Sequence, residues 1–241
     1  MLLMLAVPVW AQSSSSPSSA ETLSLEIDAL CPDAAREAAE LHSRMTIPQL
    51  SAKPTRPALR ENLLLMARQD QEARAFLQAS GLHIDPSSPE VARMREIDSA
   101  NLARLKHIVN QEGFPTAEMV GLDGVDAAWL LTVHAGGDLD FQKKILERVT
   151  QHVRRGEIRN DQVAMLTDDV LAGEGKPQRY GTNFELRDGE LKPTPMEDEA
   201  NVDNRRRAVG LGSLANYSCV LRAMYGSPEP QTSESASPTT Q

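Results

Sequence analysis

Two aspartates occupy positions that the helical periodicity of the sequence predicts to be buried, where carboxylates can support acid–base chemistry or bind a metal ion. At about 100° per residue, Asp70 falls in the middle of the apolar face of a predicted helix over residues 60–80. Asp98 falls in the middle of the apolar face of a second predicted helix, over residues 86–113. Two neighbouring helices therefore each direct an aspartate towards the core.

A buried carboxylate is costly unless it is paired, hydrogen-bonded, bound to a metal ion or protonated. Arg74 lies one turn beyond Asp70 and offers an ion pair within the same helix. Asp98 has no such simple partner, because Arg95 and Lys106 project from other faces of its helix. We therefore take Asp70 and Asp98 as candidate catalytic residues, with a purely structural role in fixing the helix register as the alternative.

A histidine lies near the end of the apolar segment AAWLLTVHA, residues 127–135. The segment is apolar on every side, which is typical of a helix surrounded by protein, so His134 is predicted to be buried. Gly136 or Gly137 is predicted to end this helix in a left-handed conformation, and Asp138 to cap the next helix. His134 completes the set of candidate catalytic residues, and a histidine that only packs is the alternative.

Further polar residues on or near apolar faces are candidates for binding a ligand. Asp168 lies at the margin of the apolar face of its helix, whereas Asp169 is predicted to point outwards. Residues 176–184 form an extended, glycine-containing segment that can cover the mouth of a pocket or simply dock a hairpin. The candidate binding residues are Asn101, Gln142, Asp168, Gln178, Tyr180 and Asn183.

The elements that must position these residues are almost all helices. The predicted helices cover residues 21–46, 60–80, 86–113, 123–137, 138–156, 160–175 and 198–225. Two short alternating segments flank Asp188-Gly189, a dipeptide that favours a tight hairpin turn. The sequence therefore predicts an all-α fold, a helical bundle of about six to seven helices with one small β-hairpin or extended flap near residues 178–193.

The two ends of the chain differ in composition from the middle. Residues 1–11 are apolar and are predicted to form a signal peptide that lacks a basic n-region, as a truncated one would. Residues 12–22 are predicted to be a disordered Ser/Pro-rich spacer, residues 23–225 a single helical domain, and residues 226–241 a disordered tail. We therefore expect a periplasmic or secreted protein; the alternative is a cytosolic protein with a hydrophobic N-terminal element.

The chain contains two cysteines, Cys31 and Cys219, and neither has a second Cys or His at metal-ligand spacing. They can pair in an oxidising compartment or stay free, and the sequence leaves both open. The formal net charge of −9 argues against nucleic-acid binding. The most basic run, residues 204–209, is expected to be a solvated helix face or a set of partners for carboxylates. The apolar N-terminal run is too short to span a membrane.

Six segments resemble an uncharacterised bacterial family of unknown function, DUF6624: ARQD, IDSANLARLKHIV, GFP, AAWLLTVHAGGDLDFQ, LTDDVLAGEGKPQRYGTNF and RRRAVGL. They follow in order over about residues 60 to 217. The family is marked by a His-Ala-Asp and a Tyr-Gly-Thr-Gln element. Here Gly136 stands in place of the acid and Asn183 in place of the glutamine. The resemblance implies a helical domain with a shared polar set, and it implies no activity.

Two functions are compatible with these residues. The first is a binding module for a small polar ligand or a protein partner, in which the inward polar cluster shapes the site. The second is a hydrolase of the cell envelope, with Asp70, Asp98 and His134, joined by Asp168, as an acid–base or divalent-metal site. No HExxH, GxSxG or glycine-rich phosphate loop is present, so neither the reaction nor a cofactor can be predicted.

Overall fold

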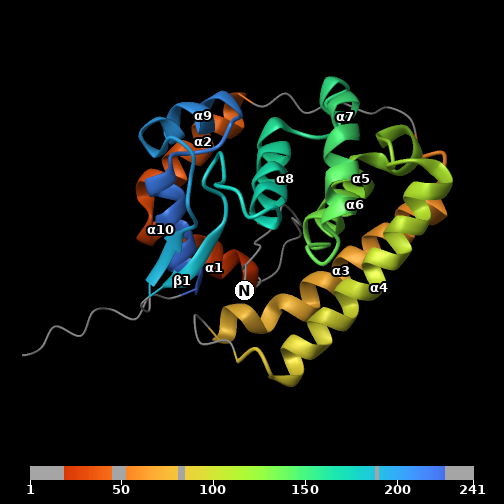
Figure 1. Cartoon of the computed structure of the whole chain (residues 1–241), viewed down its shortest axis with the longest axis horizontal. Helices are drawn as coiled ribbons and strands as arrows, with labels where there is room; N and C mark the ends of the chain where they lie inside the picture. The colour runs from red at the N-terminus through yellow and green to blue at the C-terminus, as the bar shows by residue number, and fades with distance from the viewer. Residues whose placement is uncertain (1–18, 45–52, 81–84, 188–189, 226–241) are drawn as a thin grey trace, which may run out of the picture.

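The computed structural model describes residues 19–44, 53–80, 85–187 and 190–225, and over these ranges the protein is mainly helical with a two-stranded sheet (Figure 1). This confirms the predicted all-α fold with a small hairpin. The predicted signal peptide and C-terminal tail lie outside the described residues, as does most of the predicted spacer. Residues 19–22 of that spacer belong to the first helix.

The helices in the described ranges outnumber the six to seven predicted, because three of the predicted helices are each divided in two. Their bounds are α1 Ser19–Leu30, α2 Pro32–Arg44, α3 Pro57–Ser80, α4 Pro89–Glu112, α5 Ala117–Val133, α6 Leu139–Arg148, α7 Thr150–Arg154, α8 Asn160–Gly173, α9 Val202–Ala208 and α10 Leu214–Tyr225.

Helices α3, α4 and α5 form the frame that positions the candidate site. The Ser88 hydroxyl accepts a hydrogen bond from the N–H of Val91 and so caps α4, which ends at Gly113 as predicted. Thr116 caps α5, so this helix starts earlier than the predicted residue 123. Gly121 interrupts α5 with a φ of 75°, a left-handed conformation that suits glycine.

A tight turn joins α5 to α6 and places His134 at the C-terminal end of α5. The N–H of Ala135 donates to the carbonyl of Thr132, and the N–H of Asp138 donates to that of Ala135. The predicted left-handed cap at Gly136 or Gly137 is wrong, because neither glycine has a positive φ and His134 itself is the C-cap in a right-handed conformation. Asp138 caps α6 as predicted, accepting from the N–H of Phe141.

The sheet consists of β1, Phe184–Arg187, and β2, Glu190–Pro193, which pair antiparallel with Arg187 opposite Glu190. The predicted hairpin is therefore confirmed, although its turn at residues 188–189 lies outside the described residues. Gln178 forms an isolated bridge to Met196, which ties the segment before β1 to the segment after β2.

The predicted helix over residues 198–225 is broken. A 3-10 turn at Glu199–Asn201 leads into α9, and the chain turns at Gly210, where φ is 82°, before α10 begins. Arg206 in the basic run is fully buried and donates to the carbonyls of Gly212, Tyr180 and Gly181. The expectation of a solvated face or of carboxylate partners is thus wrong for Arg206, whose partners are backbone carbonyls.

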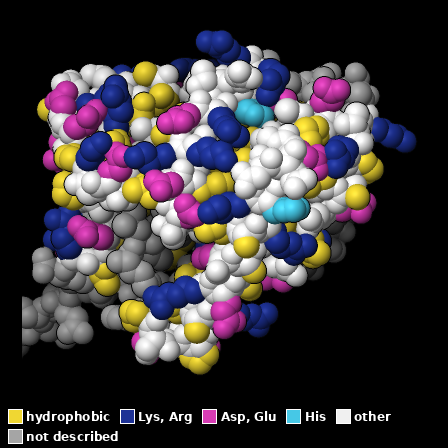
Figure 2. All heavy atoms as spheres, turned by 45° about the vertical axis from the view of Figure 1, so that its right-hand side comes forward, with side chains coloured by type: hydrophobic (Ala, Val, Ile, Leu, Met, Phe, Trp, Pro, Cys, Tyr) yellow, Lys and Arg dark blue, Asp and Glu magenta, His cyan; other side chains and the backbone are white. Residues whose placement is uncertain are grey.

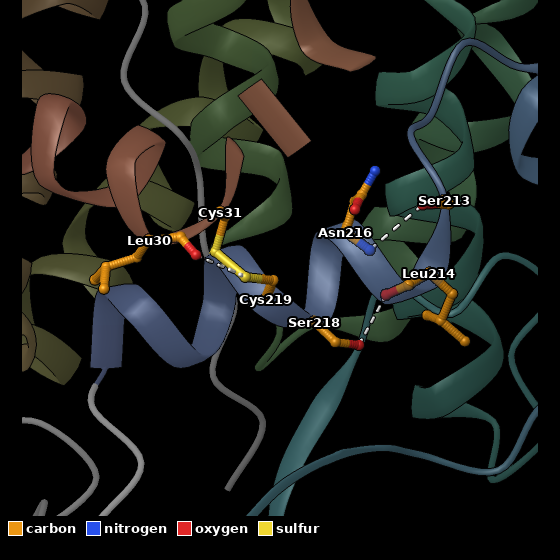
Figure 3. The surroundings of a disulfide bond; sticks show 7 residues. All are labelled: Leu30, Cys31, Ser213, Leu214, Asn216, Ser218 and Cys219. Carbon is orange, nitrogen blue, oxygen red and sulfur yellow. Dashed lines mark hydrogen bonds between the residues drawn. A yellow bond between two sulfur atoms is a disulfide. The ribbon is translucent and has the colours of Figure 1, made fainter. Parts of the chain in front are cut away.

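The two cysteines form a disulfide between the start of α2 and α10 (Figure 3). The pairing that the sequence left open therefore occurs, and it fastens α1 and α2 to the last helix. The Glu37 carboxylate of α2 strengthens the same junction. It accepts from the N–H and hydroxyl of Ser213 and from the side-chain amide of Asn216.

The helices gather into two groups with separate apolar clusters (Figure 1). One cluster lies among α3 to α8 and includes Leu63, Leu105 and Ile145. The second cluster joins the hairpin to α10, and Phe76 of α3 and Met94 of α4 pack against it. The two groups therefore meet along α3 and α4, close to the residues of the candidate site.

The face shown in Figure 2 carries interspersed basic and acidic side chains. None of the helices that the structure describes is long and apolar enough to cross a membrane.

Candidate functional site

Asp70, Asp98 and His134 come together, from three different helices. The Nδ1 atom of His134 lies 2.7 Å from Oδ2 of Asp70. Arg74 donates from one guanidinium nitrogen to Asp70 Oδ1 and from another to Asp98 Oδ1, both at 2.7 Å. These four residues form what we call the His134 site. The convergence of Asp70, Asp98 and His134 is the arrangement on which the candidate catalytic set depended.

The two carboxylates of the His134 site experience opposite pKa shifts. Burial raises the pKa of Asp70, but the hydrogen bond from His134 and the charge of Arg74 together outweigh burial, so the net pKa lies below its ordinary value. For Asp98, burial dominates over the attraction of Arg74, and the pKa lies above its ordinary value. Asp70 is therefore ionised, while Asp98 is the carboxylate that takes up a proton more readily.

His134 presents one ring nitrogen to the protein and leaves the other unused. Because an ionised carboxylate can only accept, the Nδ1 atom of His134 must carry the proton that bonds to Asp70. In the neutral ring the Nε2 atom is then an acceptor. Nε2 is buried and has no hydrogen-bond partner among the described residues. The protein thus holds an oriented imidazole whose second nitrogen is free.

Two candidate binding residues lie close to this site in the chain, and the structure assigns them different roles. Asn101 lies three residues beyond Asp98 on α4, is buried, and its Nδ2 has no hydrogen-bond partner in the described ranges. Gln142 of α6 is fully occupied on its donor side, because its amide donates to the carbonyls of Thr132 and Val133. Gln142 therefore positions the end of α5, which carries His134.

A cation already lies between the two aspartates. The guanidinium of Arg74 bonds to both Asp70 and Asp98 and so occupies carboxylate oxygens that a metal ion would otherwise use. Among the residues that the structure describes, no group of three or more His, Cys, Asp or Glu side chains is arranged to hold a metal ion. The donor set of the His134 site thus suits an ion-paired hydrogen-bond network.

The hydrogen bonds of Asp168 go to the segment before the hairpin and not to the His134 site. Its buried carboxylate accepts from the backbone N–H groups of Arg179, Tyr180 and Thr182 and from the Thr182 hydroxyl. Through these hydrogen bonds, Asp168 fixes the conformation of residues 178–184.

The candidate binding residues of that segment are also mostly occupied. Gln178 is fully buried, donates to the carbonyls of Asn183 and Thr194, and accepts from the N–H of Asn183. Tyr180 is half-buried, and its carbonyl accepts from Arg206. Asn183 is buried, and its side-chain Nδ2 has no hydrogen-bond partner among the described residues. Of the three, Asn183 has a buried side-chain donor that no described residue accepts from.

Asp169 does not point outwards as predicted. It is 5 % exposed, and its Oδ2 atom has no partner within the described ranges. Helix α8 packs against α6 and is also bonded to residues 179–182, so more than one of its faces is buried. A pattern that assumes one buried face misplaces Asp169 for this reason.

The partner of Asp98 was also missed by the sequence analysis. Sequence spacing pairs Arg74 with Asp70 within α3, but the long Arg74 side chain also reaches across to α4. The signal that could have revealed it is the position of Arg74, one turn along the same face as Asp70, on a helix followed at once by the antiparallel α4.

Comparison with known proteins gives one result. A family model described as a family of unknown function (DUF6624) matches residues 57–228. No curated protein and no solved structure matches the chain. The matched range contains every residue of the His134 site and of the segment fastened by Asp168.

Proposed function

The chain belongs to DUF6624, a family whose function is unknown, and we propose that it is a binding module that takes a small polar ligand at the His134 site. The observation that supports this proposal is the buried Nε2 atom of His134, which lacks a partner although Asp70 fixes Nδ1. A ligand hydroxyl or N–H group would supply the missing donor.

The energetics favour a ligand over simple packing. A buried polar atom without a hydrogen bond costs about 1 to 3 kcal/mol. The bond between Nδ1 of His134 and Asp70 fixes the ring, so Nε2 is well oriented towards an approaching donor. Such unsatisfied groups in native proteins call for an explanation, and a role at a functional site is one of them.

The charges of the site indicate the kind of ligand. Asp70 is balanced by Arg74 and by its hydrogen bond from His134, so the centre of the site carries little excess charge. The side chain of Asp98 is 22 % exposed and that of Arg74 is 13 % exposed, which makes this side of the cluster the one nearest to solvent. A neutral polar ligand with a hydroxyl or amide donor fits these properties.

The same geometry supports a second candidate function, an acid–base hydrolase. An Asp–His pair with a free Nε2 is the unit that removes a proton from a nucleophile in many hydrolases. No Ser, Thr or Cys hydroxyl or thiol contacts His134 among the described hydrogen bonds, so water would have to be the nucleophile. The Asp70–His134 pair is the specific observation that keeps this candidate.

The test uses a matched pair of histidine variants. The amide nitrogen of asparagine can replace Nδ1, so His134→Asn keeps the bond to Asp70 and loses Nε2. In His134→Gln the amide group lies instead at the position of Nε2, and the bond to Asp70 is lost. We would record the ¹⁵N shift of His134 Nε2 while adding glycerol, glucose or glycylglycine. We expect a saturable shift in the wild type and no binding by a stably folded His134→Asn.

Two results would contradict this function. One is an Nε2 that is already hydrogen-bonded in the free protein and does not respond to any of the three compounds. The other is His134→Asn binding as tightly as the wild type. If a compound is bound and then cleaved, and His134→Asn abolishes cleavage, the hydrolase is the correct function.

We also propose that the protein works in an oxidising compartment, either the periplasm or the cell exterior. The Cys31–Cys219 disulfide supports this location, because such bonds persist where thiols are not kept reduced. Trapping thiols with a maleimide in intact native cells tests the idea. We expect no labelling until a reductant is added, and labelling without a reductant would refute it.

A further inference from the structure

The junction of α3 and α4 contains a hollow, open to solvent, that lies outside the His134 site. The hollow has a volume of about 290 Å³ and is lined by Asn62 of α3 and by Ala103, Arg104, His107 and Ile108 of α4. None of these residues belongs to the His134 site. Ligand pockets in proteins start at about 300 Å³, so a hollow of this size suits a small molecule.

The surface inside the hollow is mainly apolar. Ile108 is buried, and Ala103 contributes only a methyl group, which leaves room at the junction of the two helices. Leu65, which is 42 % exposed, follows Asn62 by three residues and so lies on the same side of α3. An occupant with a compact apolar group would therefore remove apolar surface from water.

The hollow also contains a cation without a carboxylate partner. Arg104 donates from one guanidinium nitrogen to Oδ1 of Asn62, at 2.9 Å, and makes no other hydrogen bond or ion pair with the described residues. The bond to Asn62 holds the guanidinium beside the hollow and leaves its other N–H groups available. Helix α4 has no acidic residue between Asp98 and Glu112, so its own face supplies no counter-charge to Arg104.

Other basic side chains lie close to Arg104 along α4. His107 is exposed and makes no hydrogen bond within the described ranges. Lys144 of α6 donates to Oδ1 of Asn110, one turn beyond His107, and it also has no carboxylate partner among the described residues. The local charge therefore favours an anion, although the chain as a whole carries a net charge of −9.

A guanidinium beside an apolar hollow favours an anion that also has an apolar part. Arginine binds a carboxylate through two parallel N–H···O bonds, because the two groups match in shape and charge. The ring of His107 can add a further N–H donor. Inorganic phosphate would also pair with Arg104, but it would leave the apolar surface of the hollow exposed.

We propose that this hollow binds a small organic acid, that is, a carboxylate attached to a compact apolar group. The carboxylate bonds to Arg104, with His107 beside it, and the apolar group covers Ala103 and Ile108. This inference goes beyond the function proposed for the His134 site and does not depend on it.

Benzoate is the probe for this site, with benzamide and acetate as matched comparisons. Benzamide has nearly the same shape without the charge, and acetate has the charge without the ring. We would titrate each compound into the ¹⁵N-labelled full chain and follow the backbone amides of residues 103–108. We expect saturable shifts with benzoate and an affinity about tenfold lower for each of the other two compounds.

Three variants separate the charge, the space and the general attraction of an anion. Arg104→Gln should lower the affinity for benzoate about tenfold and leave benzamide binding unchanged, since the charge pair is then already lost. Ala103→Leu introduces a good helix former that fills the hollow, so it should abolish the shifts with benzoate and benzamide. Arg95→Gln is the control, because Arg95 is exposed on the opposite face of α4 and should leave binding unchanged.

Several results would overturn the proposal. One is the absence of saturable shifts at residues 103–108 with benzoate. Another is an equal loss of benzoate affinity in Arg104→Gln and Arg95→Gln, which would indicate unspecific attraction to basic side chains. Inorganic phosphate binding as tightly as benzoate would indicate a simple anion site. A peptide that ends in phenylalanine and binds more tightly than benzoate would indicate a protein C-terminus as the partner, and not a small acid.

Discussion

Replacing Arg74 is the strongest test of the network around His134, because this one side chain compensates two carboxylates. Asp70 is completely buried and Asp98 only 22 % exposed, so each loses a close partner in Arg74→Met. At about 4 Å between charge centres and an effective dielectric constant of about 20, each pair is worth roughly 4 kcal/mol of gross attraction. Desolvation of the charges offsets most of this.

The net loss can be estimated from what remains after the substitution. Removing one partner of a buried ion pair costs about 3 to 5 kcal/mol. Asp70 keeps its bonds to His134 and Gln71, and Asp98 can be rehydrated or take up a proton. We therefore expect Arg74→Met to lower the free energy of unfolding by about 3 kcal/mol, which corresponds to roughly 6 to 12 °C in Tm for a domain of this size.

The assay is urea unfolding at pH 7, monitored by circular dichroism, with the disulfide intact. Arg68→Met is the matched control, since Arg68 lies on the same helix but is exposed, and it should change stability by less than about 0.5 kcal/mol. In an Asp98→Asn background the loss from Arg74→Met should shrink by about 1 to 2 kcal/mol. Equal losses for Arg74→Met and Arg68→Met would show that the network contributes nothing.

Three further outcomes are expected. Replacing both cysteines, Cys31→Ser with Cys219→Ser, should lower the free energy of unfolding by up to about 5 kcal/mol, because the disulfide closes a loop with a sequence separation of 188; wild type in dithiothreitol should unfold at the same urea concentration, and no effect of reduction would contradict this. Asp168→Asn puts an NH₂ group against backbone donors and should cost about 2 to 4 kcal/mol. Hydrogen exchange should then speed up at residues 179–182, and unchanged protection there would argue against the fastening role. Because the folded pKa of Asp169, about 7, exceeds the unfolded value of about 3.9, its contribution to stability is complete below pH 4 and is lost as the pH rises towards 7, by about 1.4 kcal/mol per pH unit. Asp169→Asn should flatten the dependence of the unfolding free energy on pH over this range, and identical slopes in urea titrations of the two proteins would refute the shift.

Local periodicity was sufficient to find the centre of the His134 site. Asp70, Asp98 and His134 each interrupt an apolar pattern within a single helix, so burial can be inferred without knowing which helices are neighbours. The caps at Ser88 and Asp138 were predicted for the same reason, because a cap depends on residues within one turn.

What the sequence analysis missed depends on contacts between segments distant along the chain. The bond from Arg74 to Asp98 spans 24 residues, and the burial of Asp169 results from residues packed on a second face of α8. Arg206 is buried because its guanidinium satisfies carbonyls 25 and 26 residues earlier. The break before α10 was overlooked although Gly210 and Gly212 lie there. A helical pattern on both sides hid a turn that only backbone geometry reveals.

The bond between Cys31 and Cys219 makes most of the chain a closed ring. A protease that cuts one peptide bond between these residues opens the ring but releases no fragment. On a denaturing gel without reductant the nicked protein would stay in one piece, and two bands would separate only after reduction. After a single cleavage, the helices that carry His134 and its partners therefore remain covalently linked.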